Sequence, residues 1–113
     1  MSIRLLSLSK NEDFKSLLSG KKISNKYLTI FFKSLSDKSN KKLNIGIVAQ
    51  KKIGNAVKRN KVKRRIRNIM NQILKNIKIN LSYSYLLIAK KEIINSKFSD
   101  IKEAMLKDYK KIK

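Results

Sequence analysis

A stripe of aliphatic residues at helical spacing constrains this chain more than any other feature. The stripe consists of Val62, Ile66, Ile69, Ile73 and Ile77, which are separated by four, three, four and four positions. On a helix with 3.6 residues per turn, these side chains share one face. We therefore expect a helix from about residue 55 to residue 77, whose apolar face must be covered by other parts of the chain.

The opposite face of this predicted helix carries positive charge only. Nine of the seventeen residues in 51–67 are Lys or Arg, and neither Asp nor Glu occurs from Lys38 to Lys91. The whole chain has 29 basic and 7 acidic residues, a formal net charge of +22. Solvated helix faces ordinarily mix both signs. Because each neutralised phosphate releases a counterion, nucleic acid is the partner that such a face predicts.

The start of the predicted helix is unfavourable without an anionic partner. Lys58 and Arg59 lie in its first turn, where the helix dipole disfavours each cation by about 0.3–1 kcal/mol. Arg59 and Lys63, four residues apart, also repel each other. A phosphate group would reverse these terms, and free backbone N–H groups near residues 54–56 would face an incoming anion.

The other segments predict an α+β chain in the order helix, strands, helix, strand, helix. The predicted elements are a helix over 10–19, strands over 27–32, 43–49 and 83–89, and a last helix from residue 99. The second of these strands is expected to be central. The polar segment 34–42 predicts a hairpin loop. With neither an internal repeat nor a boundary, we expect one domain over residues 1–113, which from its charge binds nucleic acid.

The sequence indicates three helix ends. Ser9 and Glu12 have the spacing of a capping box, which predicts a helix start. Gly20 is expected to end that helix in the left-handed conformation. Ser99 is expected to cap the last helix.

Composition excludes several kinds of catalytic site. The chain has no Cys and no His, which excludes disulfides, Cys or His metal sites, and Ser-His-Asp or Cys-His triads. Glu12 and Asp13 are adjacent, so on a helix their side chains diverge by about 100°. We expect no catalytic residue and no metal ligand. The apolar runs are shorter than the roughly 18 residues that a membrane span needs, and the polar first ten residues do not suit a secretion signal. We expect a cytoplasmic protein that does not bind membranes.

The string from Lys51 to Arg67, KKIGNAVKRNKVKRRIR, resembles the basic motif of the bacterial ribonuclease P protein subunit. Asn11–Phe14 and Tyr85–Lys91 resemble that family's opening helix and closing strand, so the resemblance covers nearly the whole chain. It implies an α-β sandwich with a small mixed sheet and a left-handed β-α-β crossover. This implied path departs from the right-handed crossover that is general for such units.

The resemblance also implies a function and its partners. The family's protein binds a large catalytic RNA, and together they cut the 5′ leader from precursor transfer RNA. The RNA performs the hydrolysis with Mg²⁺, which is bound mainly by the RNA, so the protein is a non-catalytic subunit. We expect a monomer within that complex.

Two sets of residues carry the implied contacts. Those for the catalytic RNA are Lys51, Lys52, Asn55, Lys58, Arg59, Asn60, Lys61, Lys63, Arg64, Arg65 and Arg67. Those for the leader, in a cleft between the first helix and the sheet, are Phe14, Leu18, Phe31, Lys33 and Lys52. Lys61 stands where the family commonly has Arg, and Leu18 where it often has Phe. Lysine keeps the charge but loses the bidentate geometry, and leucine cannot stack on a base.

Other readings of the same residues stay open. Phe14 and Phe31 suit plain core packing as well as base stacking. The charge suits a structural RNA-binding protein of the ribosomal kind, which would not select leaders. A DNA-binding helix lacks the helix-turn-helix spacing before it. A membrane-surface helix does not suit a chain that also forms a sheet.

Overall fold

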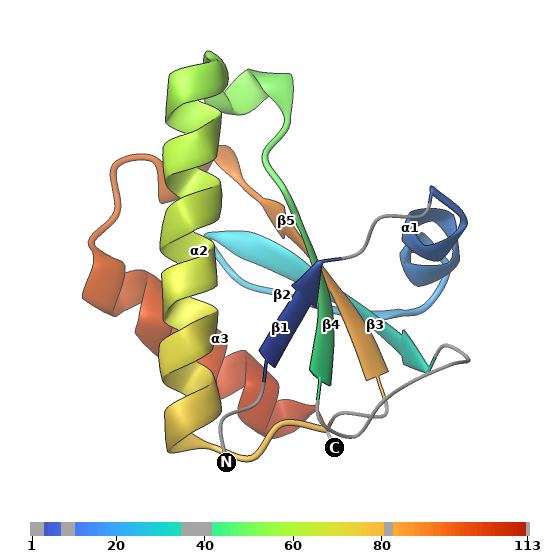
Figure 1. The fold of residues 1–113 in the computed structure, drawn as a ribbon. Helices are drawn as coiled ribbons and strands as arrows, with labels where there is room; N and C mark the ends of the chain where they lie inside the picture. The colour runs from blue at the N-terminus through green and yellow to red at the C-terminus, as the bar shows by residue number, and fades with distance from the viewer. Residues whose placement is uncertain (1–3, 8–10, 35–41, 81–82, 113) are drawn as a thin grey trace.

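The computed structural model describes residues 4–7, 11–34, 42–80 and 83–112. These residues form a five-stranded sheet with helices on both faces (Figure 1). The strands are β1 (Arg4–Ser7), β2 (Lys21–Ser24), β3 (Leu28–Ser34), β4 (Lys42–Val48) and β5 (Tyr83–Ala89). The helices are α1 (Asn11–Leu18), α2 (Ala56–Asn76) and α3 (Phe98–Lys111), with short 3₁₀ turns η1 (Lys51–Ile53) and η2 (Lys91–Ile93). The α+β class is confirmed.

The sheet is mixed, with the order β1-β4-β5-β3-β2. β1, β4 and β5 are parallel, whereas β3 is antiparallel to both β5 and β2. The middle strand is β5, and its residues Ser84 to Leu87 are all buried. A strand covered on both faces needs such a continuous buried run. The segment 43–49 is an interior strand, as expected, but the centre of the sheet is β5.

The predicted hairpin over residues 34–42 is wrong. β3 and β4 are not partners, because β5 lies between them and pairs with both. A polar segment indicates a connection but does not say which strands it joins, and the apolar run of β5 takes the inner position. Residues 35–41 lie outside the described part of the chain. The β4–α2–β5 connection joins neighbouring parallel strands and is the crossover for which the resemblance implies a left-handed path.

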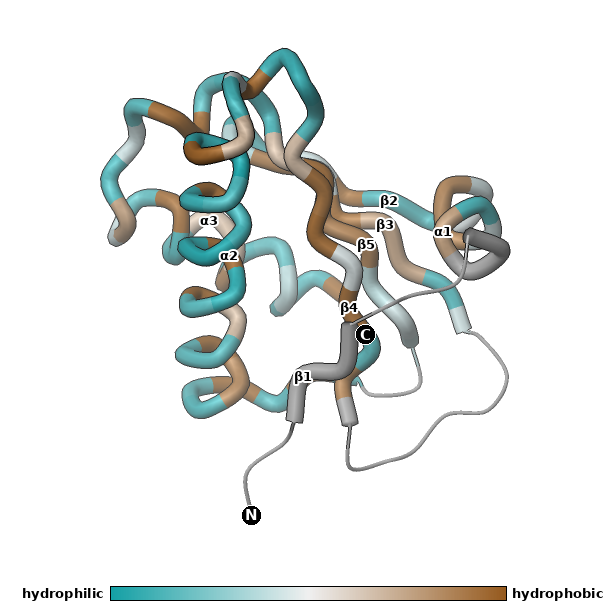
Figure 2. Tube along the Cα trace, turned by 45° about the horizontal axis from the view of Figure 1, so that its top comes forward, coloured by the Kyte–Doolittle hydropathy of each residue, from teal (hydrophilic) through white to brown (hydrophobic). Residues whose placement is uncertain are grey.

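The main core lies between the sheet and the helices α2 and α3, which cover the same face (Figures 1 and 2). Four members of the aliphatic stripe are buried there, from Val62 to Ile73, while Ile77 is half-buried. They pack in one cluster with strand residues such as Ile45 and Leu87. The helix predicted over 55–77 is confirmed, and its apolar face meets the sheet as the spacing requires.

A smaller packing layer lies on the other face of the sheet, which α1 covers (Figure 1). Leu17 on α1 and Leu86 on β5 are both fully buried. Phe31 on β3 is the cross-strand partner of Leu86, so both point to the α1 side. α1 contacts β3 and β5. The two faces of the sheet therefore have different neighbours, a helical pair on one and a single short helix on the other.

Two of the three expected helix ends differ from the prediction. Gly20 does not have a positive φ. It is needed for close approach, since a Cβ there would lie 2.8 Å from the Phe32 carbonyl oxygen and 2.9 Å from the Cβ of Lys33. Ser99 is not a cap, because α3 begins one residue earlier after Lys97, whose side chain makes no capping hydrogen bond. Ser9 lies outside the described residues.

Among the described residues, none of the helices combines the length and the apolar composition that crossing a membrane requires.

Candidate nucleic-acid interface

The turn that leads into α2 depends on a glycine and an asparagine. Gly54 has a φ of 144°, which favours glycine, and a Cβ there would lie 2.9 Å from Cδ of Lys58. Asn55 is the N-cap, and its side-chain oxygen accepts the backbone N–H of Lys58 at 3.0 Å. The backbone N–H of Gly54 donates to the Lys51 carbonyl oxygen at 3.1 Å, so this group is used within the protein, contrary to the expectation of free groups near residues 54–56. The same turn brings η1, with Lys51 and Lys52, against α2.

Most of the residues predicted to bind the catalytic RNA are exposed on η1 and on one side of α2. α2 contains no acidic residue, and its tube in Figure 2 is largely hydrophilic except along the core side. The exposed members of the predicted set are Lys51, Lys52, Asn55, Lys58, Asn60, Lys61, Lys63, Arg64 and Arg67. We call these side chains, together with Arg59 and Arg65, the cationic face.

Arg59 and Arg65 lie partly against the protein, unlike the rest of the cationic face. Both are half-buried. A terminal nitrogen of Arg65 donates to the backbone oxygen of Ser96 at 3.4 Å, which ties α2 to the segment before α3. The Nε of Arg59 is buried without a hydrogen-bond partner among the described residues. These two arginines therefore have structural contacts as well as positive charge.

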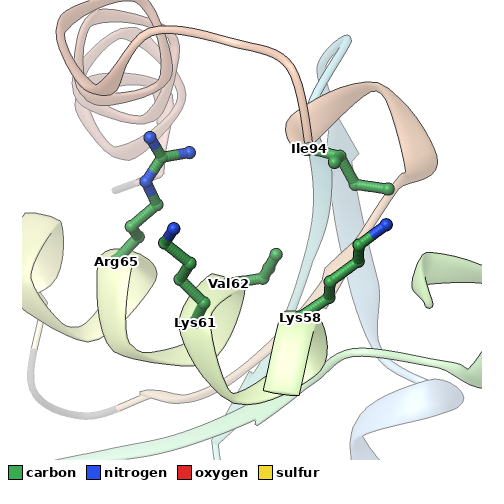
Figure 3. A pocket seen from close by; sticks show the side chains of 5 residues that line it. All are labelled: Lys58, Lys61, Val62, Arg65 and Ile94. Carbon is green, nitrogen blue, oxygen red and sulfur yellow. The ribbon is translucent and has the colours of Figure 1, made fainter. Parts of the chain in front are cut away.

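A pocket of about 190 Å³ opens between the cationic face and the turn after η2 (Figure 3). Lys58, Lys61 and Arg65 line it from α2, and two apolar side chains, Val62 and Ile94, complete the lining. Three cations around an apolar surface can hold a phosphate while an attached apolar group packs between the aliphatic side chains. Ile94 could not be predicted from the sequence, because no local pattern indicates that the residues after η2 face α2.

The residues predicted to bind the leader fall on the α1 side of the sheet, with one outlier. Phe14 is half-buried on α1, and Leu18 is 50% exposed. On β3, Phe31 is half-buried and Lys33 is exposed, on the same face as α1. Lys52 is exposed on η1, which follows β4.

The strand register places Lys33 and Lys52 at opposite ends of the sheet. Lys33 pairs with Ser84 at the start of β5. η1 follows Val48, which pairs with Ile88 near the end of β5. Phe31 lies between these ends, where its partner is Leu86. The register therefore spreads Lys33, Phe31 and Lys52 along the length of the sheet rather than in one compact cluster, which suits an extended single strand.

Acidic residues are few and lie elsewhere in the described chain. No three Asp, Glu, His or Cys side chains gather there in a way that could hold a metal ion. An exposed ion pair joins Lys107 and Glu103 at 3.8 Å within α3, and the buried carboxylate is that of Asp108, also on α3. The described surface can therefore attract and position a polyanion.

Comparisons with known proteins assign the chain to a family. The model of the Ribonuclease P family matches residues 4–113. A ribonuclease P protein component from Mycoplasma mycoides is 36% identical over 106 residues, covering 94% of both chains. One from Listeria monocytogenes is 32% identical and covers 88% of this chain and 81% of its own.

A solved structure of the ribonuclease P protein from Thermotoga maritima gives the same result for the fold. It superposes with a TM-score of 0.80 at 26% identity and covers 96% of this chain and 98% of its own. A Staphylococcus aureus ribonuclease P protein superposes with a TM-score of 0.75, also at 26% identity, over 94% and 93%. The chain belongs to the ribonuclease P protein component family, whose members are the non-catalytic protein subunit of an endoribonuclease that matures the 5′ end of transfer RNA.

Proposed function

We propose that the cationic face binds the catalytic RNA of ribonuclease P, while the α1 side of the sheet binds the 5′ leader of precursor transfer RNA. The observation that carries this proposal is the single sign of charge on α2, whose opposite face is anchored in the core by buried aliphatic residues. A helix held so firmly presents its lysines and arginines in a fixed arrangement, which suits a folded RNA. Residues 1–113 would then act as one RNA-binding domain.

Burial and position support a leader contact on the α1 side. Leu18 is 50% exposed, and Phe14 and Phe31 are each only half-buried. Lys33 and Lys52 add positive charge at the two ends of the line. Single strands bind where bases meet aromatic rings and phosphates meet cations. We name this line of five residues the leader face.

The chemistry in this proposal belongs to the RNA. Mg²⁺ in proteins is usually bound through one or two carboxylates, and the cationic face contains no Asp or Glu. We therefore assign the Mg²⁺ of the reaction mainly to the catalytic RNA and give the protein a positioning role as a monomer within the complex. We place this activity in the cytoplasm. A general structural RNA-binding protein, the alternative, is not favoured by the family match.

Reconstitution with the catalytic RNA tests both contacts separately. Arg64→Ala should weaken assembly with the catalytic RNA, measured by filter binding at several salt concentrations. Lys107→Ala is the matched control, because it removes one positive charge from α3, away from the cationic face. Equal losses in both variants would contradict a defined interface and leave only the effect of net charge.

The leader contact requires a comparison of two substrates. Phe31→Ala in the assembled enzyme should weaken binding of precursor transfer RNA and leave binding of leaderless transfer RNA unchanged. Low Mg²⁺ makes the protein's contribution easier to measure, because the RNA then has fewer ions to hold the substrate. If Phe31→Ala affects both substrates equally, the leader face does not contact the leader.

A further inference from the structure

A second pocket lies beyond the leader face, at the end of the sheet where Lys33 stands. It has a volume of about 430 Å³ and lies between the corner that joins α1 to β2, the end of β3 and the start of β5. The side chains that give it chemical character are Lys21, Phe32, Lys33 and Tyr83. Sites for small ligands commonly have volumes of about 300–1,000 Å³. Three of these residues are outside both the leader face and the cationic face, namely Lys21, Phe32 and Tyr83.

Two aromatic rings form one wall of this pocket. The ring centroids of Phe32 and Tyr83 are 5.3 Å apart and the rings are inclined at 60°, an edge-to-face pair. Both side chains are half-buried. Tyr85 supports them from the core, with its ring 6.4 Å from Phe32 and 6.3 Å from Tyr83, and its hydroxyl donates to the Asn80 carbonyl at 2.7 Å. A pair held from behind in this way offers a rigid surface for a flat apolar group.

Positive charge lies beside the aromatic pair. Lys21 is the cross-strand partner of Phe32, and Lys33 follows Phe32 on β3. Both lysines are exposed, and the pocket lining contains no carboxylate. A flat ring next to an anionic group is the chemistry of a nucleotide, whose base stacks on aromatic rings while its phosphate meets lysine.

The position of the pocket identifies the source of that nucleotide. Lys33 belongs both to the pocket and to the leader face, so the two surfaces are continuous. The register places Phe32 and Tyr83 on the side of the sheet that faces α2 and α3, whereas Lys33 points to the α1 side, so the pocket curves around this end of the sheet. A strand that follows the leader face to Lys33 therefore reaches the aromatic pair by passing around this end of the sheet, past Ser19 and Gly20 at the end of α1.

From this geometry we propose that the pocket binds one nucleotide of the single-stranded leader, further from the cleavage site than the bases held along the leader face. The inference rests on the proposed function, since it needs the leader to lie on the α1 side. Phe32 and Tyr83 provide the stacking surface, and Lys21 and Lys33 contact the flanking phosphates.

The test uses the chain assembled with its catalytic RNA and precursor transfer RNAs whose leaders are lengthened one nucleotide at a time. Affinity should rise with leader length until the pocket is filled. In Tyr83→Leu, which keeps apolar bulk, the last increment in affinity should disappear. We expect a loss of at least about fivefold, the lower end of the range for one stacked base. Shorter leaders should bind as they do to the unsubstituted chain. Tyr83→Phe should restore the increment.

Two further variants keep the inference falsifiable if Tyr83→Leu does not fold. Lys21→Ala removes an exposed side chain and should reduce the same increment and its dependence on salt. Tyr27→Leu, a half-buried tyrosine outside the pocket, is the control and should leave the increment intact. An unchanged length profile in Lys21→Ala and a folded Tyr83→Leu would overturn the inference. The inference would also be overturned if these two variants assembled more weakly with the catalytic RNA in the absence of precursor transfer RNA, because the pocket would then bind the catalytic RNA.

Failure of this inference is distinguishable from failure of the proposed function. If Phe31→Ala abolishes the preference for leader-bearing substrate and Tyr83→Leu has no effect, only the pocket assignment falls. If Phe31→Ala has no effect either, the leader does not use this side of the sheet and both proposals fall.

Discussion

The side-chain amide of Asn25 donates a hydrogen bond of 2.7 Å to the carboxylate of Asp108, which is buried and lies 83 residues later in the chain. The amide oxygen of Asn25 accepts the backbone N–H groups of Tyr27 and Leu28, at 2.7 and 3.0 Å. One side chain therefore shapes the turn between β2 and β3 and also holds α3 against it. This link fastens α3 to the edge of the sheet, where β2 turns into β3.

Asn25→Ala should lower the free energy of unfolding by about 2–3 kcal/mol, since it leaves backbone donors and a buried carboxylate without their partner. Urea unfolding followed by circular dichroism measures the change. Asn68→Ala, at an exposed position of α2, is the matched control and should change stability by less than about 0.5 kcal/mol. Equal effects in the two variants would mean that the Asn25–Asp108 contact contributes nothing to stability.

Ile66→Asp should prevent folding, because Ile66 is fully buried under the sheet and a carboxylate there would lose its hydration. Val57→Asp introduces the same group on the same helix at a position that is 76% exposed. This control should remain folded, and a carboxylate in the first turn suits the helix dipole. Far-ultraviolet circular dichroism and melting temperature distinguish the two. A folded Ile66→Asp protein would contradict the assignment of the core face.

Arg64→Ala and Arg65→Ala should separate RNA binding from stability. Arg64 is exposed, so its loss should weaken RNA binding and reduce the slope of log affinity against log salt by about 0.7–0.9 per lost phosphate contact. Arg65 also donates to Ser96, so Arg65→Ala should lower the melting temperature in addition. If Arg65→Ala melts at the same temperature as Arg64→Ala, the bond to Ser96 is not stabilising.

Two core tyrosines predict a loss of stability in alkali. Burial, with a smaller effect from Tyr83, raises the pKa of Tyr85 well above the ordinary value of 10.0. Burial, followed by Tyr85 and Asp108, also raises the pKa of Tyr109. The folded chain therefore keeps both protons where the unfolded chain loses them. Their contribution to stability is complete below about pH 10 and falls as the pH rises above it.

Replacing each tyrosine by phenylalanine tests this alkaline dependence and separates two hydroxyl environments. Between pH 9 and pH 11, the free energy of unfolding should fall less in each variant than in the unsubstituted chain. The difference for each variant corresponds to the titration of the one hydroxyl that it lacks. At pH 7, Tyr85→Phe should cost about 1 kcal/mol, because it removes the bond to Asn80. Tyr109→Phe should cost nothing, since this buried hydroxyl has no hydrogen-bond partner among the described residues. An equal cost at pH 7 would contradict that difference.

Periodicity predicted the helices and the three long strands correctly because local patterns determine them. The stripe from Val62 to Ile73 repeats at helical spacing and is buried as expected. The short strands β1 and β2 went unpredicted, since four residues of mixed polarity carry no clear alternation. The position of β5 between β3 and β4 was also not predicted, because strand order depends on contacts between distant segments rather than on local pattern.

The sites show the same division between local and distant information. The basic residues of α2 lie on one helix, so the sequence alone identified the cationic face. Ile94 and Arg65 share a pocket, and Phe32 and Tyr83 share another, only because the fold brings separate segments together. Tyr83 has a sequence signal in hindsight, since it is an aromatic residue at the half-buried start of a strand, but its neighbour Lys21 is 62 positions away.

The central place of β5 has a consequence for how the protein is made. β3 and β4 leave the ribosome before β5. In the folded sheet they do not pair with each other, and each pairs with β5, which is translated about 40 residues after them. Until residues 83–89 emerge, the nascent segment exposes the apolar edges of two incomplete half-sheets and a long run of positive charge. The sheet can therefore be completed only late in synthesis. A ribosome that stalls shortly before residue 83 would leave a fragment that is prone to aggregate and to bind polyanions.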